Sequence, residues 1–244
     1  MKSLFAALSF LTRFPAARWA RFDTADVARS AGWFPLIGIL LGAICATAAS
    51  LLREHLPSVI VAVVLIALDA LLTGALHFDG LADTADGFGG GSDREDVLRI
   101  MRDHSIGSYG GVALILLIGL KIAAYGVLLM RDHWLSTVVL TSMLGRWSIF
   151  LLAAALPYAR QTSSVIQGMG KGSLFWGSLT AVCALLVAEA WRAWVAAAAV
   201  LLLTLCSGIY CRRRIGGVTG DTLGANLELC ECAALFAFLW SGHP

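Results

Sequence analysis

The sequence has few charged residues, and this shortage decides its class. Asp, Glu, Lys and Arg make up 14% of the 244 residues, whereas about a quarter is usual in soluble domains. Hydrophobic residues reach 59%, and the mean hydropathy is +0.80. This composition predicts a polytopic membrane protein formed by one integral domain over residues 1–244. The first fourteen residues lack the pattern of a cleavable signal peptide.

Several catalytic motifs are also missing. The sequence contains no Gly-x4-Gly-Lys-Ser/Thr, so a P-loop is excluded. It contains no Gly-x-Ser-x-Gly and no His-Glu-x-x-His, so acyl transfer and zinc-dependent hydrolysis have no support. The six cysteines form no Cys-x-x-Cys pair and lie in or beside apolar runs. We therefore expect small buried thiols, with neither a zinc site nor a disulfide framework.

Long apolar runs fill most of the chain. A transmembrane helix needs about 20 mostly apolar residues. Seven segments qualify, of which the fifth is short: 32–52, 58–76, 110–130, 135–156, 174–188, 193–210 and 225–240. The pattern predicts an all-α bundle of about seven spans. Residues 4–14 are too short to span and are expected to lie along the membrane interface.

The basic residues are distributed unevenly between the connections. Thirteen Lys and Arg residues fall on the side of the N-terminus and the long connections 77–109, 157–173 and 211–224. Only Arg53, Arg131 and Arg192 fall on the other side. Because Lys and Arg collect in cytoplasmic loops, the sequence predicts a protein of the cell inner membrane whose long loops face the cytoplasm.

Three carboxylates follow the second apolar run. Asp79, Asp83 and Asp86 stand at spacings of four and three, which places them on one face of a helix. Such carboxylates repel one another unless a hard divalent cation takes their oxygens as ligands. We expect a Mg²⁺ site at the membrane surface, on a helix that continues the second span and ends in the glycines of 87–91. The alternative is an ordinary solvated acidic loop.

The rest of this connection offers further candidates. Asp93 begins a predicted short helix that runs to about Met101. Arg102 is suited to phosphate oxygens, and Asp103 to a further metal ligand or a base. His104 is equally compatible with catalysis and with a solvated interfacial position.

The last long connection combines glycines with threonines at the start of a helix. Gly220 and Thr222 suit close contact with a phosphate group, and Asp221 is placed to complete the metal site. The triplet 212–214 is mainly a topology signal. In the middle connection, Lys171 follows Gly168 and Gly170 and offers one cation to a phosphate.

Ionisable residues also occur inside the apolar runs. Such groups are unfavourable in hydrocarbon unless they are paired or face a wet cavity. Lys121 or Arg146 can pair with Asp69, or can line a polar cavity below the acidic loop, where Arg146 would bind substrate. Glu228 and Glu231 lie on adjoining faces of the last helix. They either add carboxylates to the metal site, Glu228 foremost, or stabilise the helix N-terminus through its dipole.

Carboxylates with Mg²⁺, scattered cations and glycine-rich turns together indicate phosphoryl transfer, in which the protein positions groups and neutralises developing charge. The same residues carry a resemblance to a known family. The matching pieces are 11–15, 34–38, 77–87, 100–103 with Gly107 and 110–111, and 217–225. At these residues the chain resembles the cobalamin synthases, the adenosylcobinamide-GDP ribazoletransferases.

The resemblance implies an activity and a site. The implied enzyme joins α-ribazole, or its 5′-phosphate, to adenosylcobinamide-GDP, and it requires Mg²⁺; the products are adenosylcobalamin, or its phosphate, and GMP. The bilayer is the other expected partner, nucleic acid is not, and a homo-oligomer is compatible with the sequence. The implied site is Asp79, Asp83, Asp86, Asp103 and Asp221 around one or two Mg²⁺ ions, with His77, Arg102 and Lys171 nearby.

Two other functions compete with this one. The CDP-alcohol phosphatidyltransferases use Asp-x2-Asp-Gly-x2-Ala-Arg; residues 83–87 match its opening, but Gly90 and Gly91 replace Ala-Arg, and the later Gly-x3-Asp-x3-Asp is absent. A divalent-cation transporter would account for ionisable residues in the spans. The concentration of carboxylates in a loop and the lack of an inverted repeat count against a transporter.

Overall fold

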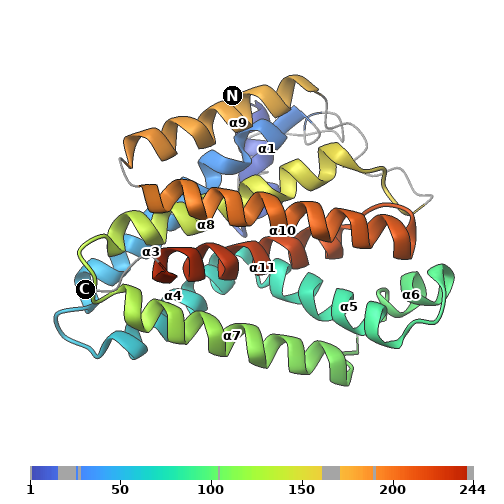
Figure 1. The fold of residues 1–244 in the computed structure, drawn as a ribbon, viewed down its shortest axis with the longest axis horizontal. Coiled ribbons are helices and arrows are strands. Elements are labelled where there is room, and N and C mark those ends of the chain that lie inside the picture. Colours follow the sequence, from blue (N-terminus) through green and yellow to red (C-terminus); the bar gives the residue numbers. More distant parts are fainter. Residues whose placement is uncertain are drawn as a thin grey trace.

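The computed structural model describes residues 2–15, 26, 29–103, 105–160, 171–188 and 191–240. Its regular elements are helices. In chain order they are α1 (Lys2–Leu11), the 3₁₀ turn η2 (Ala31–Trp33), α3 (Phe34–Leu52), α4 (Ser58–Thr73), α5 (Leu76–Gly90), α6 (Arg94–Ile100), α7 (Ser108–Leu128), α8 (Trp134–Ala155), α9 (Lys171–Val187), α10 (Trp191–Ile215) and α11 (Gly220–Trp240) (Figure 1). In addition, Tyr158 and Val218 form an isolated β-bridge between the segments that follow α8 and α10. The predicted all-α class is confirmed.

Five helical segments in the described part of the chain are long and apolar enough to cross a membrane. They are Ala31–Leu52, Ser108–Leu128, Trp134–Ala155, Trp191–Ile215 and Gly220–Trp240. Helices α4 and α5 make a sixth span only if they count as one bent element. The chain is therefore a multi-pass membrane protein. The described residues give five or six spans where about seven were predicted, because the apolar part of α9, Leu174–Val187, is short for a span and the second predicted span is broken.

The break lies between α4 and α5. Gly74 has φ +69° and Ala75 has φ +58°, and the two helices meet at 91°. Consecutive left-handed residues end a right-handed helix and turn the chain aside. A side chain at Gly74 would overlap Arg13, since its Cβ would lie 2.7 Å from the Arg13 Nε atom. The prediction that the aspartate-bearing helix simply continues the second span is therefore wrong.

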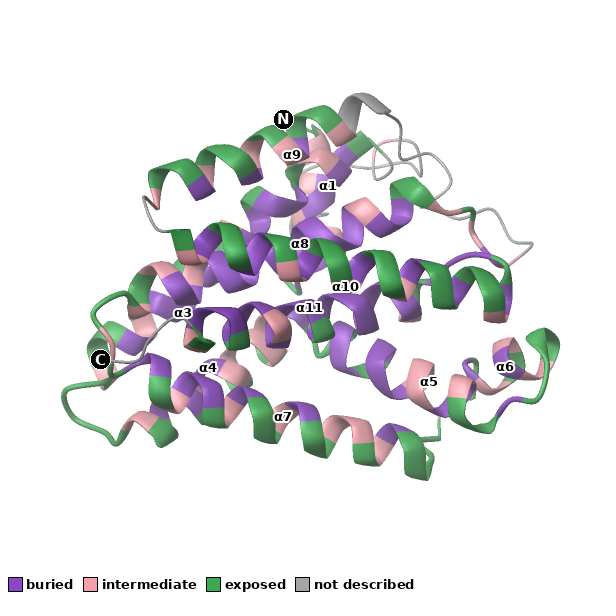
Figure 2. Ribbon diagram, viewed as in Figure 1, coloured by how far each residue is buried: buried purple, intermediate pink, exposed green. Residues whose placement is uncertain are grey.

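The centre of the bundle is formed by α8 and α11, the two most buried of the long apolar helices (Figure 2). Helix α3 packs against α8 through Gly38 and Gly42. A Cβ atom at either glycine would lie 2.7 Å from a Cα atom of α8, that of Met143 or Val139. This Gly-x3-Gly spacing allows close backbone contact between membrane helices.

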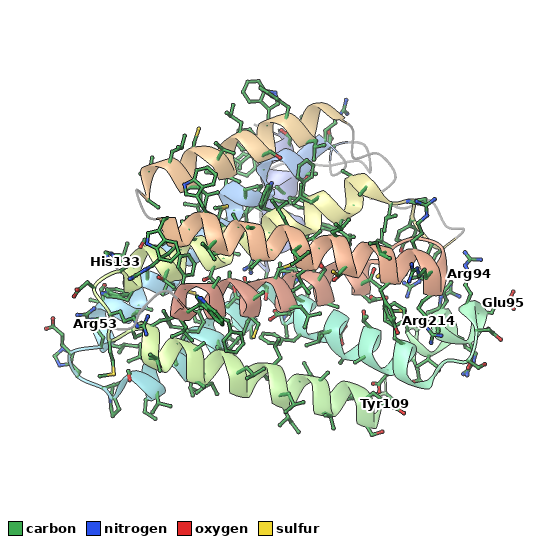
Figure 3. All side chains as sticks on the ribbon, viewed as in Figure 1. Arg53, Arg94, Glu95, Tyr109, His133 and Arg214 are labelled. Atoms are coloured by element: carbon green, nitrogen blue, oxygen red, sulfur yellow. The ribbon has the colours of Figure 1, made fainter. Side chains whose placement is uncertain are left out.

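The long connections gather at one end of the bundle. Figure 3 shows Arg94, Glu95 and Arg214 at this end, and Arg53 and His133 at the other. Hydrogen bonds join α7 to α5, residue 160 to residue 221, and residue 214 to residue 91. The predicted grouping of the long connections on one side is thus confirmed for their described parts.

Candidate active site

Helices α5 and α11 lie against each other at this end of the bundle because two glycines permit it. A Cβ at Gly80 would lie 2.8 Å from the backbone oxygen of Asp221, and a Cβ at Gly224 would lie 3.2 Å from the Cα of His77. Small residues at such positions let backbones approach closely. The close contact brings the aspartates of α5 beside the first turn of α11.

We define the acidic cluster as Asp79, Asp83, Asp86 and Asp221. Asp79 is exposed, Asp83 and Asp221 are half-buried, and Asp86 is buried. Among the described residues, the charges that act most strongly on Asp83 are those of the other three carboxylates, followed by the Arg160 guanidinium. Carboxylates therefore outnumber guanidinium groups in this cluster. An excess of carboxylate oxygens suits a hard divalent cation.

The four aspartates are near neighbours but are not drawn tightly together. Among the described residues, no three of them bring one ligand atom each within 4.8 Å of one another. Asp79 and Asp83 stand one helical turn apart on α5, and Asp221 faces them from α11. The residue types fit Mg²⁺, and their side chains would have to come closer together to surround it.

Asp86 holds the start of α7. Its two carboxylate oxygens accept hydrogen bonds from the backbone N–H groups of Gly107 (2.8 Å) and Gly110 (2.9 Å). A Cβ at either glycine would overlap this carboxylate. Both oxygens already have backbone donors, so Asp86 fixes α7 against α5 and is the least available of the four for a metal ion.

The first turn of α11 is closed by a reciprocal pair of threonines. Thr222 N–H donates to the Thr219 hydroxyl at 3.2 Å, and Thr219 N–H donates to the Thr222 hydroxyl at 2.8 Å. This is the geometry of a capping box, with threonine at the position usually held by Glu or Gln. Thr222 is buried and engaged in the cap, so its arrangement favours a structural role over the predicted substrate contact. Gly220, by contrast, borders open space.

Arginines fasten the surrounding loops. Arg214 donates to the backbone oxygens of Phe88 (3.0 Å) and Gly91 (2.9 Å). Arg94 donates to those of Ile215 (2.8 Å) and Ala159 (2.7 Å). The end of α5, the start of α6, the end of α10 and the segment after α8 are therefore tied together around the acidic cluster.

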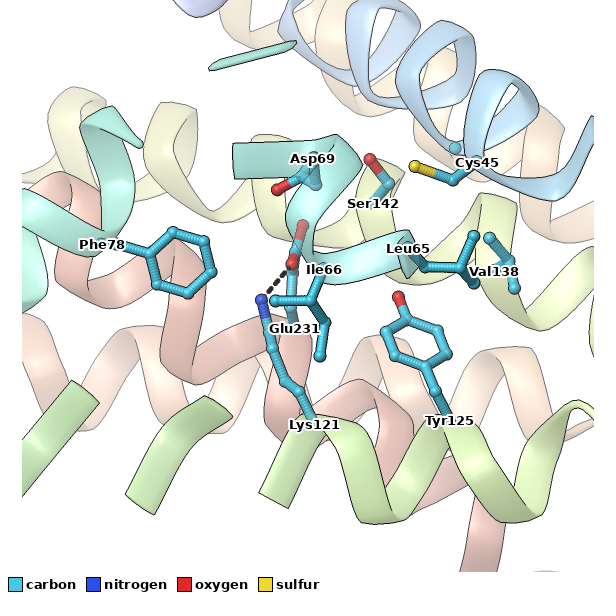
Figure 4. Close-up of a pocket in the computed structure, with 11 residues that line it drawn as sticks. Cys45, Leu65, Ile66, Asp69, Phe78, Lys121, Tyr125, Val138, Ser142 and Glu231 are labelled. Atoms are coloured by element: carbon cyan, nitrogen blue, oxygen red, sulfur yellow. Dashed lines mark hydrogen bonds and ion pairs between the residues drawn. The ribbon is translucent and has the colours of Figure 1, made fainter. Parts of the chain in front are cut away.

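A second group of charges lies deeper in the bundle. We call it the inner network: Asp69, Lys121, Arg146, Glu228 and Glu231. Lys121 Nζ contacts Glu228 Oε2 at 2.5 Å and Glu231 Oε2 at 2.7 Å, and Arg146 contacts Asp69 at 2.9 Å and also Glu231. Lys121 and Glu231 line a cavity of about 20 Å³, together with Asp69 and the hydroxyl-bearing Ser142 and Tyr125 (Figure 4). That volume accommodates about one water molecule.

The inner network shows which partners the ionisable residues of the apolar runs have. Arg146 is fully buried and pairs with two carboxylates, so the structure gives no support to its predicted contact with substrate. Glu228 is fully buried beside Lys121 and is seven positions beyond Asp221, a rise of about 10 Å along the helix. The structure therefore places Glu228 apart from the acidic cluster, although it groups Glu228 with Asp69 and Glu231 as neighbouring carboxylates.

The other predicted site residues are scattered. His77 is buried, and the charges acting on it are those of Arg146, Asp69 and Lys121, so it belongs beside the inner network. Arg102 and Asp103 are exposed after α6, where Asp103 accepts a hydrogen bond from the Ser105 N–H group at 3.0 Å. The side chain of Lys171 and the whole of His104 lie outside what the structure describes.

Sequence reasoning overlooked two features of the site. From the sequence, Arg160 is only one of the basic residues in the connection 157–173. In the structure its guanidinium contacts Asp221 at 2.7 Å. Gly80 and Gly224 set the contact between α5 and α11. A signal for the glycines exists in the sequence, since each stands within three residues of a candidate aspartate. No local pattern indicates Arg160.

Comparison with known proteins shows the family of the chain. The family model described as cobalamin-5-phosphate synthase matches residues 3–239. The adenosylcobinamide-GDP ribazoletransferase of Klebsiella pneumoniae is 39% identical over 98% of this chain and 100% of its own length. The enzymes of that name from Syntrophobacter fumaroxidans and Ectopseudomonas mendocina are 37% and 39% identical, over 95% and 96% of this chain and 95% and 97% of their own. No solved structure matches the chain. The chain belongs to the cobalamin-5-phosphate synthase family.

Proposed function

We propose that this protein transfers the phospho-cobinamide group of adenosylcobinamide-GDP to α-ribazole or its 5′-phosphate, the last step in assembling the cobalamin nucleotide loop. Its near full-length relatives bear the name of that activity. The observation that carries the proposal is the acidic cluster, in which four carboxylates lie near the Arg160 guanidinium at the bundle end that also carries Arg94 and Arg214. Lipid headgroup transfer is not favoured, since the relatives are named ribazoletransferases.

The reaction breaks the phosphoanhydride of the substrate and forms a phosphate diester. A ribose hydroxyl oxygen of ribazole, one that is also free in the 5′-phosphate, forms a bond to the phosphorus on the cobinamide side of the diphosphate. The bond from that phosphorus to the bridging oxygen breaks, and GMP leaves with the electron pair. The hydroxyl proton passes to a carboxylate of the acidic cluster, for which the exposed Asp79 and the half-buried Asp83 are placed best.

Asp79, Asp83 and Asp221 are the residues that would hold Mg²⁺. When bound, the ion would neutralise charge on the diphosphate and on the leaving phosphate. Asp86 positions this end of α5 through the backbone of α7. Arg214 and Arg94 hold the surrounding loops, because each donates two hydrogen bonds to backbone oxygens.

We further propose that the acidic cluster faces the cytoplasm and that the protein resides in the inner membrane. The support is the distribution of Lys and Arg, thirteen of which the sequence assigns to the side of the N-terminus and the long connections. Of these, Arg94 and Arg214 lie at the bundle end that carries the aspartates (Figure 3). The soluble substrates would then reach the site from the side on which the nucleotide is made.

GMP release by purified protein tests the proposal. Adenosylcobinamide-GDP and α-ribazole are supplied with Mg²⁺ or with EDTA, and GMP and the corrinoid product are measured. We expect turnover only with Mg²⁺, and loss of turnover in Asp83→Asn but not in Asp132→Asn, an exposed aspartate at the opposite end. Equal GMP release with EDTA, or full activity of Asp83→Asn, would contradict the metal site. Corrinoid uptake into vesicles without GMP formation would favour a transporter.

A further inference from the structure

Among the described residues, Arg160 is a cation that acts on Asp83 within the acidic cluster. Its Nη2 donates to Asp221 Oδ2 at 2.7 Å, and the Thr219 hydroxyl donates to the same oxygen at 3.2 Å. The two side chains are 17% and 23% exposed, so the pair is shielded from bulk water. In this arrangement a guanidinium holds an oxygen that the proposed function assigns to a divalent cation.

The backbone fixes Arg160 in this place. Ala159 N–H donates to the backbone oxygen of Val218 at 2.8 Å, and Val218 N–H donates to that of Pro157 at 2.9 Å. Arg94 donates to the Ala159 oxygen from the other side. The residue before Arg160 is therefore held on two sides, directly beside the start of α11.

The guanidinium has donor capacity left. Its Nε atom is buried and has no hydrogen-bond partner among the described residues. A buried donor without an acceptor is unfavourable. Together with Nη2, this N–H group belongs to the planar fork of donors with which arginine binds carboxylate or phosphate in a bidentate manner. Asp221 satisfies one of the two donors, and a phosphate group would satisfy both.

We propose that Arg160 is a substrate-binding residue that exchanges partners during turnover. Without substrate, the Arg160 guanidinium is paired with the Asp221 carboxylate. When the nucleotide-activated substrate enters with a divalent cation, Asp221 turns to the cation and Arg160 takes oxygens of the diphosphate. This inference rests on the proposed function, and it explains why one guanidinium stands inside a cluster of carboxylates.

The exchange predicts opposite effects on metal and substrate. In Arg160→Gln, Asp221 no longer has a competing cation, so Mn²⁺ added alone and followed by its electron paramagnetic resonance signal should bind about tenfold more tightly. The same variant loses its bidentate phosphate donors, so the KM for adenosylcobinamide-GDP should rise about tenfold or more. The matched control is Arg99→Gln, an exposed arginine paired with Asp96 on α6, which should change neither quantity.

Two results would overturn the inference. One is Mn²⁺ affinity that stays equal or weakens in Arg160→Gln while the melting temperature falls, since that shows a purely structural brace. The other is an unchanged KM. If Arg160→Gln does not insert, Arg160→Lys decides the matter: it keeps the charge, so Mn²⁺ affinity should hold while KM rises, and an unchanged KM there rejects the inference. Absence of GMP release by the wild type would reject the proposed function instead, and the Mn²⁺ measurement would still report competition at Asp221.

Discussion

The acidic cluster and the inner network contain similar residues but differ in how their charges are balanced. The acidic cluster sets four carboxylates against one guanidinium and is partly open to solvent. The inner network sets three carboxylates against two cations, and four of its five members are buried. Charged residues that pair with one another and nearly balance, as in the inner network, are suited to holding the helices together. Accessible carboxylates in excess, as in the acidic cluster, are suited to binding a cationic ligand. The contrast predicts that substitutions in the network will affect stability, and those in the cluster will affect turnover.

Glu231→Gln should have the largest effect on stability. Glu231 is the only network carboxylate in contact with both Lys121 and Arg146. Its neutralisation removes a charge-assisted contact from both cations at once, while Lys121 keeps Glu228 and Arg146 keeps Asp69. Such hydrogen bonds contribute about 1.5–3 kcal/mol each, so the loss of stability should reach about 3 kcal/mol or more. Thermal unfolding in detergent measures the loss, with Glu54→Gln, on an exposed connection, as the control. An unchanged melting temperature would show that the network is not a structural element.

Gly80→Ala should have an intermediate effect that reaches both regions. The added methyl group meets the Asp221 backbone at 2.8 Å, so α5 and α11 must separate. Overpacking of this kind costs about 1–3 kcal/mol, and the acidic cluster widens, so turnover should fall as well. Gly119→Ala on α7, where the added atom meets nothing within 4 Å, is the control. Equal activity of the two variants would argue against a site formed by this helix contact.

Glu228→Gln should be much milder than Glu231→Gln. Glu228 contacts Lys121 through Oε2 only, and its Oε1 has no partner among the described residues. Its neutralisation leaves two carboxylates for two cations, and an amide oxygen still accepts from Lys121. We expect a loss of about 1 kcal/mol or less, measured by the same unfolding assay. A loss as large as that of Glu231→Gln would reject the charge balance described above.

Asp83→Asn should have the smallest effect on stability and the largest on catalysis. Removal of one of four neighbouring negative charges relieves repulsion, so the free energy of unfolding should change by no more than about 0.5 kcal/mol. Turnover should fall by about a thousandfold, because electrostatic stabilisation of the transferred phosphate is lost. GMP release and thermal unfolding of the same preparation separate the two effects. If turnover and the free energy of unfolding fell together, Asp83 would have a structural role like that of the inner network residues.

Much of the candidate site follows from local sequence patterns. The helical spacing of Asp79, Asp83 and Asp86, the cap of α6 at Asp93 and the position of Asp221 in a first turn were all predictable. The sequence did not predict that Glu228 and His77 lie apart from the aspartates. How deeply these two residues are buried in the bundle depends on how α5, α7, α8 and α11 pack. Their spacing along the chain gives no information about that burial.

By itself, the sequence determined that the protein is a helical, multi-pass membrane protein, and it predicted an aspartate motif for phosphoryl transfer, because composition and helical spacing are local properties. Only the tertiary structure decided which charges balance each other. Ion pairs such as Arg146 with Asp69 and Arg160 with Asp221 join segments that are far apart in the chain. Their distances are fixed by the 91° turn after α4 and by glycine contacts between helices, and these depend on the whole packed bundle.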